Sequence, residues 1–462
     1  MKTPIYDFVT EYINSEAVRF HMPGHKGKGL LGCEDRDITE ISGADALYEA
    51  SGIIGESEEN ATALFGTGRT VYSTEGSTQC IKAMLELARR WWQKKQKCAD
   101  GITSSSSRPV IVAARNVHKA FLYAAILLDF DVVWLWSEEE NPSLCSCAVS
   151  PETLKKVLEE QGNKVAAVYI TSPNYLGGMA DVSALAKVCH EYTALLLVDN
   201  AHGAYLHFLE HSLHPLDLGA DLCCDSAHKT LPVLTGGAYL HISKTAPKEL
   251  LGWVKGAMEL FGSTSPSYLI LQSLDLCNKY LSENYRAELR RYCEWVDVCR
   301  LQLKEKGWQI EETDPLRITI KASDGSSGRQ LAEQLSAQNI ECEFADRDYL
   351  VLMVTPENGF LDLHSLFEVI DEEKLNQDIT NRGGVNLPAG NIKKAMTMRV
   401  AYFSAGETVP AEQAVGRICR MPMATCPPAI PVIVPGEVIN EAAVQSFLYY
   451  GIENVEVVKW QK

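Results

Sequence analysis

One lysine, Lys229, lies in a sequence context suited to covalent chemistry. It follows a short apolar run that ends at Asp225, and small and hydroxyl residues flank it. A buried lysine is costly unless the fold uses its amine, because the charged form loses its hydration. An isolated lysine at the end of a strand usually reaches solvent, so a reactive amine needs the support of a second feature.

That second feature is the carboxylate of Asp199, thirty residues earlier at the end of the apolar run Leu195–Val198. In open α/β sheets, ligands bind at the carboxyl ends of the strands. An aspartate at this edge can pair with the pyridine nitrogen of pyridoxal 5′-phosphate (PLP) and so make the ring a strong electron sink. Alone, Asp199 would be read as a helix cap or turn residue, but together with Lys229 it indicates a PLP site.

A third feature is the start of a helix that suits a phosphate group. Gly76, Ser77 and Thr78 open the amphipathic stretch Ser77–Lys97. Glycine permits close approach, the two hydroxyls can donate hydrogen bonds, and the helix N-terminus favours an anion. Many helices begin in this way and bind nothing. This helix start therefore indicates a phosphate site only in combination with the lysine and the aspartate.

The chain between residues 61 and 243 alternates short β-rich runs with amphipathic helical stretches. Runs that are apolar on both faces suit a buried parallel sheet, with the helices as right-handed crossovers. This pattern predicts a three-layer α/β domain. The predicted strands are Thr70–Thr74, Pro109–Ala113, Val132–Trp136, Val165–Ile170, Leu195–Asp199, Leu222–Asp225 and Gly237–His241, and the clearest helices are Ser77–Lys97 and Ser183–Tyr192.

The flanking regions predict an arm and a smaller domain. We expect an N-terminal arm and helix at 1–60, a PLP-binding large domain at 61–285 and a small C-terminal α+β domain at 286–462. A long helical segment, 266–306, would connect the two domains. In the small domain we expect a strand, a helix and a second strand, at Ile318–Lys321, Gly328–Gln338 and Tyr349–Thr355. Loops are expected at 99–107 and 378–391. The Pro-rich stretch 426–431 suits neither a central strand nor a helix interior.

Composition excludes several classes of protein. The net charge of −17 and the absence of any basic run argue against a nucleic-acid partner. The acidity chiefly favours solubility and, more weakly, the approach of a cationic substrate. The 14 cysteines include no CxxC pair, which predicts reduced core thiols, no metal site and a cytoplasmic location. Neither a secretory signal nor a membrane-spanning run is expected.

Eight short segments occur in a characteristic order along the chain. They are His21–Lys26, Arg115–Lys119, Ser172–Tyr175, Asp199–Gly203, Ser226–Leu231, Ser263–Tyr268, Pro427–Pro431 and Pro435–Glu437. In this order they resemble the Orn/Lys/Arg decarboxylase family, whose large domain has the aminotransferase-like PLP-dependent transferase fold (fold type I). The resemblance covers most of the chain. It implies a lyase that decarboxylates arginine, lysine or ornithine in polyamine biosynthesis, and a homodimer or larger homo-oligomer with shared active sites.

The resemblance also implies catalytic roles. Lys229 forms the internal aldimine, Asp199 pairs with the pyridine nitrogen, and His118 stacks on the ring. The substrate displaces Lys229, CO₂ leaves as electrons flow into the ring, and either His228 or Lys229 returns a proton to Cα. The cofactor contacts implied in addition are Gly76, Ser77, Thr78, Ser226 and His228 at the phosphate, His202 near the phenolic oxygen, and Thr264 and Ser265 from the neighbouring subunit.

Three positions depart from the family's common pattern. Asn200 stands where a glutamate is frequent, Ala429 where a glycine is usual, and Tyr48 where a histidine is frequent. We expect these positions to lie near the substrate entrance. The family's choice among arginine, lysine and ornithine is therefore not transferred to this chain.

Other readings of the same residues remain open. A basic substrate side chain needs a carboxylate partner, for which Asp45, Glu49 and Glu437 are candidates. An aminotransferase or aldolase would share the lysine and the aspartate, and Arg399 could then bind the α-carboxylate of the substrate, although a structural ion pair is the simpler interpretation of this arginine. A non-catalytic regulatory relative is a further alternative, against which the Lys229, Asp199 and His118 set argues.

Overall fold

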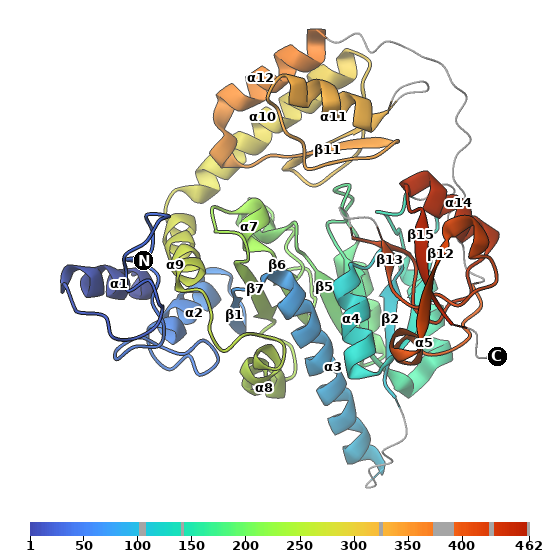
Figure 1. The fold of residues 1–462 in the computed structure, drawn as a ribbon, viewed down its shortest axis with the longest axis horizontal. Helices are drawn as coiled ribbons and strands as arrows, with labels where there is room; N and C mark the ends of the chain where they lie inside the picture. The colour runs from blue at the N-terminus through green and yellow to red at the C-terminus, as the bar shows by residue number, and fades with distance from the viewer. Residues whose placement is uncertain (101–107, 140–142, 323–326, 373–391, 425–428, 460–462) are drawn as a thin grey trace. The chain divides into compact units, whose positions relative to one another are not determined.

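The computed structural model describes residues 1–100, 108–139, 143–322, 327–372, 392–424 and 429–459. Contacts divide the chain into two compact units (Figure 1). The first comprises Met1–Ser105 with Val182–Arg290, and the second comprises Ser106–Asp181 with Arg291–Lys462. The domain boundaries expected from the sequence, at residues 60 and 285, stay a prediction.

Four buried strands of the first unit lie in the order β1-β7-β6-β5. Strands β5 and β6 are parallel, as expected, but β7 runs antiparallel to both β6 and β1. The prediction of a wholly parallel sheet is therefore wrong. The β6–β7 connection contains only the four-residue helix α7 (Ala227–Thr230), which is too short for a parallel crossover. The strands are β1 Arg69–Ser73, β5 Leu195–Asp199, β6 Leu222–Asp225 and β7 Ala238–Ile242.

The pairing of β5 with β6 sets the position of the predicted site. Asp199 lies opposite Cys224 in the parallel ladder. Since both strands point the same way, the segments that follow them leave the same edge of the sheet. Asn200–Gly203 and Ser226–Lys229 are thus neighbours, although the chain makes a long excursion between them.

The helices of the first unit confirm the predicted helical stretches. Helix α3 packs against β6, β7 and α8 (Figure 1), and its apolar face is buried. It continues to Asp100, so the predicted loop begins later than expected, and residues 101–107 lie outside the described part. The helices are α1 Pro4–Asn14, α2 Ile53–Leu64, α3 Gly76–Asp100, α6 Val182–Glu191, α8 Lys248–Glu259 and α9 Tyr268–Ser282.

The long helix predicted at 266–306 is in fact two helices, α9 and α10 (Tyr285–Glu305). The break falls at Glu283 and Asn284. The Asn284 carbonyl accepts hydrogen bonds from the backbone N–H groups of Ala287 and Glu288, at 3.1 and 3.2 Å. Asn284 therefore occupies the N-cap position of α10, where asparagine is a favoured residue.

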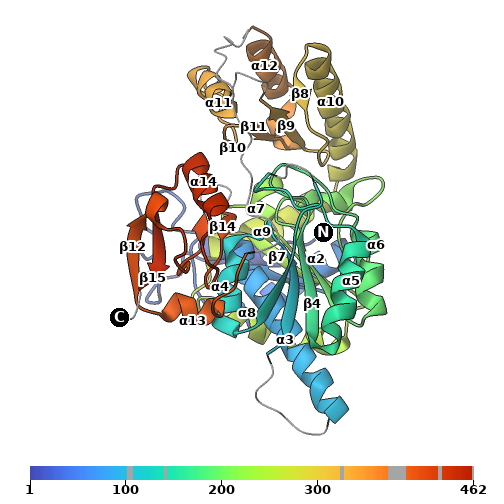
Figure 2. The ribbon, with the colours of Figure 1, turned by 90° about the vertical axis from the view of Figure 1, so that its right-hand side faces the viewer.

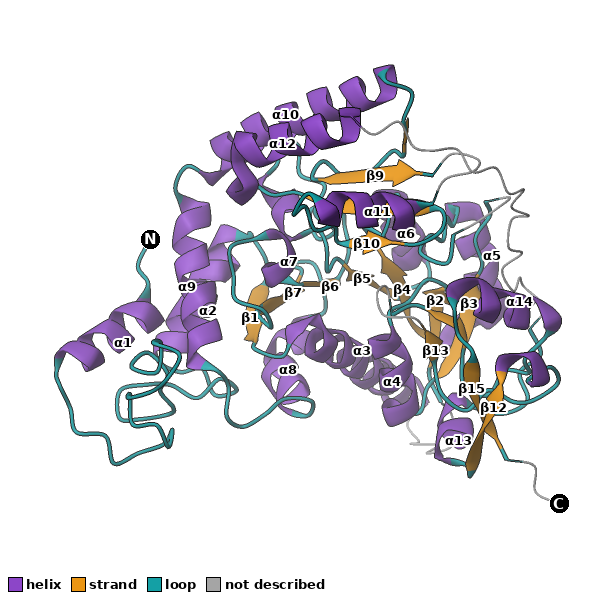
Figure 3. Ribbon diagram, turned by 45° about the horizontal axis from the view of Figure 1, so that its top comes forward, coloured by secondary structure: helices purple, strands orange, loops and turns teal. Residues whose placement is uncertain are grey.

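The second unit contains an antiparallel sheet in the order β10-β11-β9-β8, and α11 packs against β11 (Figure 2). This confirms the expected strand–helix–strand pattern. Three parallel strands of the same unit lie in the order β4-β2-β3 (Figure 3). The elements are β2 Val110–Ala114, α4 Lys119–Leu128, β3 Asp131–Leu135, α5 Pro151–Gln161, β4 Val165–Thr171, β8 Gln309–Ile310, β9 Arg317–Lys321, α11 Gly328–Ala337, β10 Phe344–Ala345, β11 Tyr349–Met353 and α12 Gly359–Glu372.

The C-terminal part of the second unit contains two small antiparallel sheets, β12–β15 and β13–β14. Pro431, the last residue of the Pro-rich stretch, begins β14 of a two-stranded sheet. Residues 425–428 and the predicted loop 378–391 lie outside the described residues. The elements are α13 Met398–Phe403, β12 Gly406–Pro410, β13 Met423–Ala424, β14 Pro431–Ile433, α14 Glu441–Tyr450 and β15 Asn454–Val458.

The described cysteines are all free thiols, and most of them are buried, in agreement with the expected core thiols. Among the described residues, no helix is both long and apolar enough to cross a membrane.

Candidate active site

The amine of Lys229 lies just beyond β6, on the short helix α7. Its Nζ is 3.0 Å from Nε2 of His202, which is 5% exposed. Lys229 itself is only partly buried. A partly buried lysine whose amine is hydrogen-bonded to an imidazole is well placed to react with a ligand at the edge of the sheet.

The carboxylate of Asp199 lies at the end of β5 and is 2% exposed. Its Oδ1 accepts a hydrogen bond from the Ala201 N–H at 3.3 Å and from the Cys224 thiol at 3.6 Å. These two donors orient the carboxylate. The sheet therefore brings the predicted amine and the predicted carboxylate to one edge.

The N-terminus of α3 supplies donors for an anion. Gly76 adopts a positive φ of 70°, and its N–H donates to the Gly236 carbonyl at 2.7 Å. An anion at this helix end would therefore be bound by the N–H groups of Ser77 and Thr78. The Ser226 hydroxyl donates to the Ser77 hydroxyl at 2.9 Å, so the segment that carries the lysine contacts the start of α3.

His228 borders the same helix end, because a Cβ built on Gly76 would lie 4.0 Å from its Cε1. Its Nδ1 donates to the Gly237 carbonyl at 2.9 Å. Burial lowers the pKa of His228, and the charge of Lys229 lowers it further. The imidazole is therefore neutral near pH 7, with Nε2 as a hydrogen-bond acceptor.

These observations test whether the residues fit PLP. The cofactor needs an amine for its aldehyde carbon, a carboxylate for its pyridine nitrogen and donors for its phosphate. The first unit provides all three, and glycine at position 76 leaves the start of α3 without a side chain of its own at that point. The residues present fit this cofactor.

Three predicted site residues are not joined to this group by the described contacts. His118, in the second unit, caps α4, and its Nδ1 accepts from the Ala120 N–H at 3.2 Å. Thr264 and Ser265 are exposed in the loop between α8 and α9. Stacking by His118 and the contribution of Thr264 and Ser265 to a neighbouring subunit stay predictions.

Two of the positions that depart from the family pattern now have a structural explanation. The Tyr48 hydroxyl accepts from Gln79 Nε2 at 2.9 Å, so Tyr48 lies beside the start of α3. A Cβ on Gly262 would lie 1.7 Å from this hydroxyl, so the tyrosine requires glycine there. Ala429 has a φ of 59°, a conformation that glycine adopts more readily, which explains the family's usual glycine.

Two of the three carboxylates suggested for a basic substrate serve the fold. Asp45 accepts hydrogen bonds from the backbone N–H groups of residues 46, 51, 52, 54 and 55 and so fixes the start of α2. Glu437 pairs with Arg115 at 3.0 Å and accepts from the Val434 N–H at 2.9 Å. Glu49 is exposed.

We expect Asp45→Ala to lower the free energy of unfolding by about 2 kcal/mol, because five backbone N–H groups, of which that of Ile54 is buried, lose their acceptor. Urea denaturation of the purified variant measures this change. Glu49→Ala, which removes an exposed carboxylate from the same loop, is the matched control and should leave the midpoint unchanged. Equal midpoints for Asp45→Ala and wild type would contradict the assignment.

Arg399 has a structural role in the second unit. Its guanidinium donates to the carbonyls of Ile126 and Leu127, at 2.9 and 3.1 Å, and lies over the ring of Phe403. An arginine at the last carbonyls of a helix stabilises that helix end. Arg399 is thus a structural arginine through carbonyl and ring contacts, rather than through the ion pair that was expected.

We therefore expect Arg399→Ala to change the KM for the amino-acid substrate by less than about twofold, whereas loss of a bidentate carboxylate contact would raise KM about tenfold or more. Steady-state kinetics of the PLP-loaded variant distinguish the two. A large rise in KM at unchanged kcat would instead indicate that Arg399 binds the carboxylate of the substrate.

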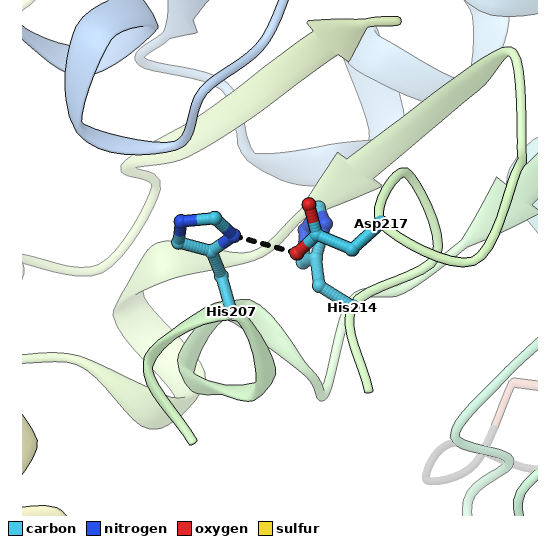
Figure 4. A group of neighbouring side chains, drawn as sticks. All are labelled: His207, His214 and Asp217. Atoms are coloured by element: carbon cyan, nitrogen blue, oxygen red, sulfur yellow. Dashed lines mark hydrogen bonds and ion pairs between the residues drawn. The ribbon is translucent and has the colours of Figure 1, made fainter. Parts of the chain in front are cut away.

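His207, His214 and Asp217 form a cluster of potential metal ligands (Figure 4). The His207 Nδ1 and the Asp217 Oδ2 are 2.7 Å apart. Two ligands of one tetrahedral ion lie about 3.3 Å apart, given bonds of about 2.0 Å. The cluster is therefore a hydrogen-bonded link between the short helix η2 (Ala204–Phe208) and the loop that follows it.

Asp225 was not among the predicted site residues. Its carboxylate is fully buried and contacts two histidines and Asn200. The available signal was an acidic residue inside an apolar run directly before the lysine segment. Its partners lie 11 to 25 residues away in the chain, so the pattern of the sequence alone did not reveal them.

Comparison with solved structures defines the class of fold. The constitutive lysine decarboxylase of E. coli superposes with a TM-score of 0.78 at 18% identity, covering 99% of this chain and 82% of its own. The fold is the three-layer α/β fold of the aminotransferase-like, fold-type-I PLP-dependent enzymes, with a smaller C-terminal α+β domain.

Sequence comparison then gives the family. The model of the Orn/Lys/Arg decarboxylase major domain matches residues 3–323, and that of the C-terminal domain matches residues 378–455. The chain belongs to the Orn/Lys/Arg decarboxylase family and is an enzyme. The Bacillus subtilis uncharacterized protein YaaO is 29% identical over 471 residues, which cover 96% of this chain and 93% of that protein. The arginine decarboxylase of the same organism is 26% identical over 484 residues, covering 98% and 94%.

Proposed function

We propose that this enzyme uses PLP to decarboxylate arginine, lysine or ornithine to the corresponding amine and CO₂. The observation that carries the proposal is the convergence of the Lys229 amine, the Asp199 carboxylate and the N-terminus of α3 within the first unit. Family membership and full-length similarity to proteins named arginine decarboxylase support the substrate class.

The residues divide the work as follows. Bound PLP supplies an electron sink that accepts the electrons of the broken Cα–carboxylate bond. Lys229 binds the cofactor covalently, and His202 Nε2 accepts a hydrogen bond from its amine. Asp199 holds a proton on the pyridine nitrogen. Ser77 and Thr78 hold the phosphate at the helix N-terminus.

The proton that replaces the carboxylate on Cα comes, in this proposal, from Lys229. The alternative donor was His228. Its lowered pKa makes the imidazole neutral, and its one remaining N–H proton is donated to the Gly237 carbonyl. A neutral imidazole held in this way can orient substrate as an acceptor but is a poor acid.

We further propose a cytoplasmic homodimer or larger homo-oligomer that acts in polyamine biosynthesis. The free thiols support a reducing compartment. The exposure of Thr264 and Ser265 supports their predicted use by a neighbouring subunit. Sedimentation of the purified protein tests the assembly.

A substrate panel tests the proposed reaction. PLP-loaded enzyme is incubated separately with arginine, lysine and ornithine, while CO₂ release and the organic product are measured, with Lys229→Ala as the blank. We expect stoichiometric CO₂ and amine from at least one of the three. A keto acid product would instead indicate an aminotransferase, and no reaction with all three would contradict the substrate class.

A further inference from the structure

A buried hydrogen bond joins the residues that follow β5 and end β6. The Asn200 Nδ2 donates to the Asp225 Oδ1 at 2.7 Å, and both residues are 0% exposed. Asn200 directly follows Asp199, and Asp225 directly precedes Ser226 and the lysine segment. The bond therefore links the two pieces of chain that carry the carboxylate and the amine of the proposed PLP site.

Asp225 is held as a carboxylate. Its Oδ2 lies 3.1 Å from His214 Nε2 and 3.2 Å from His241 Nε2, and both histidines are almost fully buried. Burial alone would raise the pKa of Asp225, but the charges and hydrogen bonds of the two histidines outweigh it and lower the pKa well below its usual range. The far nitrogen of His241 bonds the Thr70 hydroxyl at 2.8 Å, so the network reaches β1.

Position 200 consequently requires a donor. The structure gives Asn200 a second, buried atom, Oδ1, with no hydrogen-bond partner, and a Cβ on Gly203 would lie 2.1 Å from it. The amide N–H group of Asn200 is thus the part of the side chain that bonds Asp225, and the absence of a side chain on Gly203 leaves space for the Asn200 Oδ1 atom. A carboxylate at position 200 would face the Asp225 carboxylate at a position that is 0% exposed, which is strongly unfavourable.

We propose that Asn200 and Asp225 are a positioning pair, whose amide–carboxylate bond fixes the Asp199 carboxylate and the Lys229 amine at the separation that PLP requires. The inference rests on the proposed function, since it assumes that PLP binds between these two groups. The pair also explains why this chain has asparagine at position 200, where the family frequently has glutamate. The carboxylate of the pair is supplied by Asp225, so position 200 must supply the donor.

A charge exchange tests the pair. The variants are Asn200→Asp, Asp225→Asn and the double variant that combines them. Asn200→Asp sets two carboxylates against each other, and Asp225→Asn replaces the charge-assisted bond with a neutral bond between two amides. The double variant restores an amide–carboxylate bond with donor and acceptor reversed, and the amide introduced at position 225 still presents its carbonyl oxygen to the histidines. Asn278→Asp is the matched control, because Asn278 is another fully buried asparagine of the first unit, bonded to Tyr72 at 2.6 Å.

Three quantities are measured for each variant: the PLP dissociation constant, the visible spectrum of the bound cofactor, and the thermal unfolding midpoint without PLP. We expect each single variant to raise the dissociation constant about tenfold and to shift the spectrum, and the double variant to return to within about threefold of wild type. Asn278→Asp should lower the midpoint while leaving PLP affinity and spectrum unchanged.

The outcomes separate the two proposals. If wild type binds no PLP, the proposed function fails and this inference fails with it. If wild type binds PLP and the single variants bind it equally well, or if Asn278→Asp weakens binding as much as they do, only the positioning pair is overturned. Should the single variants fail to fold, a folded, PLP-binding double variant supports the pair, and a double variant that also fails refutes it.

Discussion

We expect Lys229→Ala to abolish covalent retention of PLP and to lower the decarboxylation rate by about four orders of magnitude. The reason is the position of the amine, beside His202 and near the N-terminus of α3. Lys255, a buried lysine of the first unit, is used by the fold, where its Nζ bonds Glu58 and the Leu47 carbonyl, each at 2.6 Å. Borohydride reduction, dialysis and peptide mass spectrometry locate the modified lysine, and CO₂ release gives the rate.

Lys244→Ala is the control for this experiment, because it removes an exposed lysine just after β7. It should retain covalent PLP and the wild-type rate. Recovery of covalent PLP on a different lysine, with an unchanged rate in Lys229→Ala, would show that Lys229 is not the reactive amine.

The second large effect is expected for Asp199→Asn, which should lower kcat by about two to three orders of magnitude while PLP still binds. The amide has the same shape and can still accept from the Ala201 N–H, so the strand end keeps its geometry. It cannot hold a proton on the pyridine nitrogen by charge, and the cofactor becomes a weaker electron sink. Measurement of kcat together with the PLP dissociation constant separates chemistry from binding.

Asp221→Asn is the matched control for this change. Asp221 is a buried carboxylate of the same sheet region, 4% exposed, that accepts from the Leu196 N–H at 2.8 Å. Its substitution should reduce stability and leave kcat unchanged. A kcat for Asp199→Asn equal to that of wild type would show that the charge of Asp199 has no role in the reaction.

Much of the site could be predicted because its signals are local. Lys229, Asp199 and Gly76 each lie at the end of a strand or the start of a helix, and strand ends carry ligands in sheets of this kind. The predicted strands Leu195–Asp199 and Leu222–Asp225 have the bounds that the structure gives them. Short apolar runs of this length identify strands well, since both faces are buried.

The direction of β7 and the break between α9 and α10 were not evident from the same patterns. An apolar run has the same appearance in a parallel and in an antiparallel strand, so its direction depends on the length of the connection. The break is confined to two residues, Glu283 and Asn284, inside an otherwise periodic stretch. Both features depend on the tertiary arrangement of the neighbouring elements, which the hydrophobic pattern does not contain.

The sequence by itself determined the family and the residues that can carry the chemistry, because motif order and residue type are properties of the chain. Only the tertiary structure decided how those residues are used. It assigned Asp45 to a helix start and Arg399 to a helix end, made His228 neutral and placed Asp225 between two histidines. The physical reason is that hydrogen-bond partners and burial, which set protonation, come from groups brought together through space.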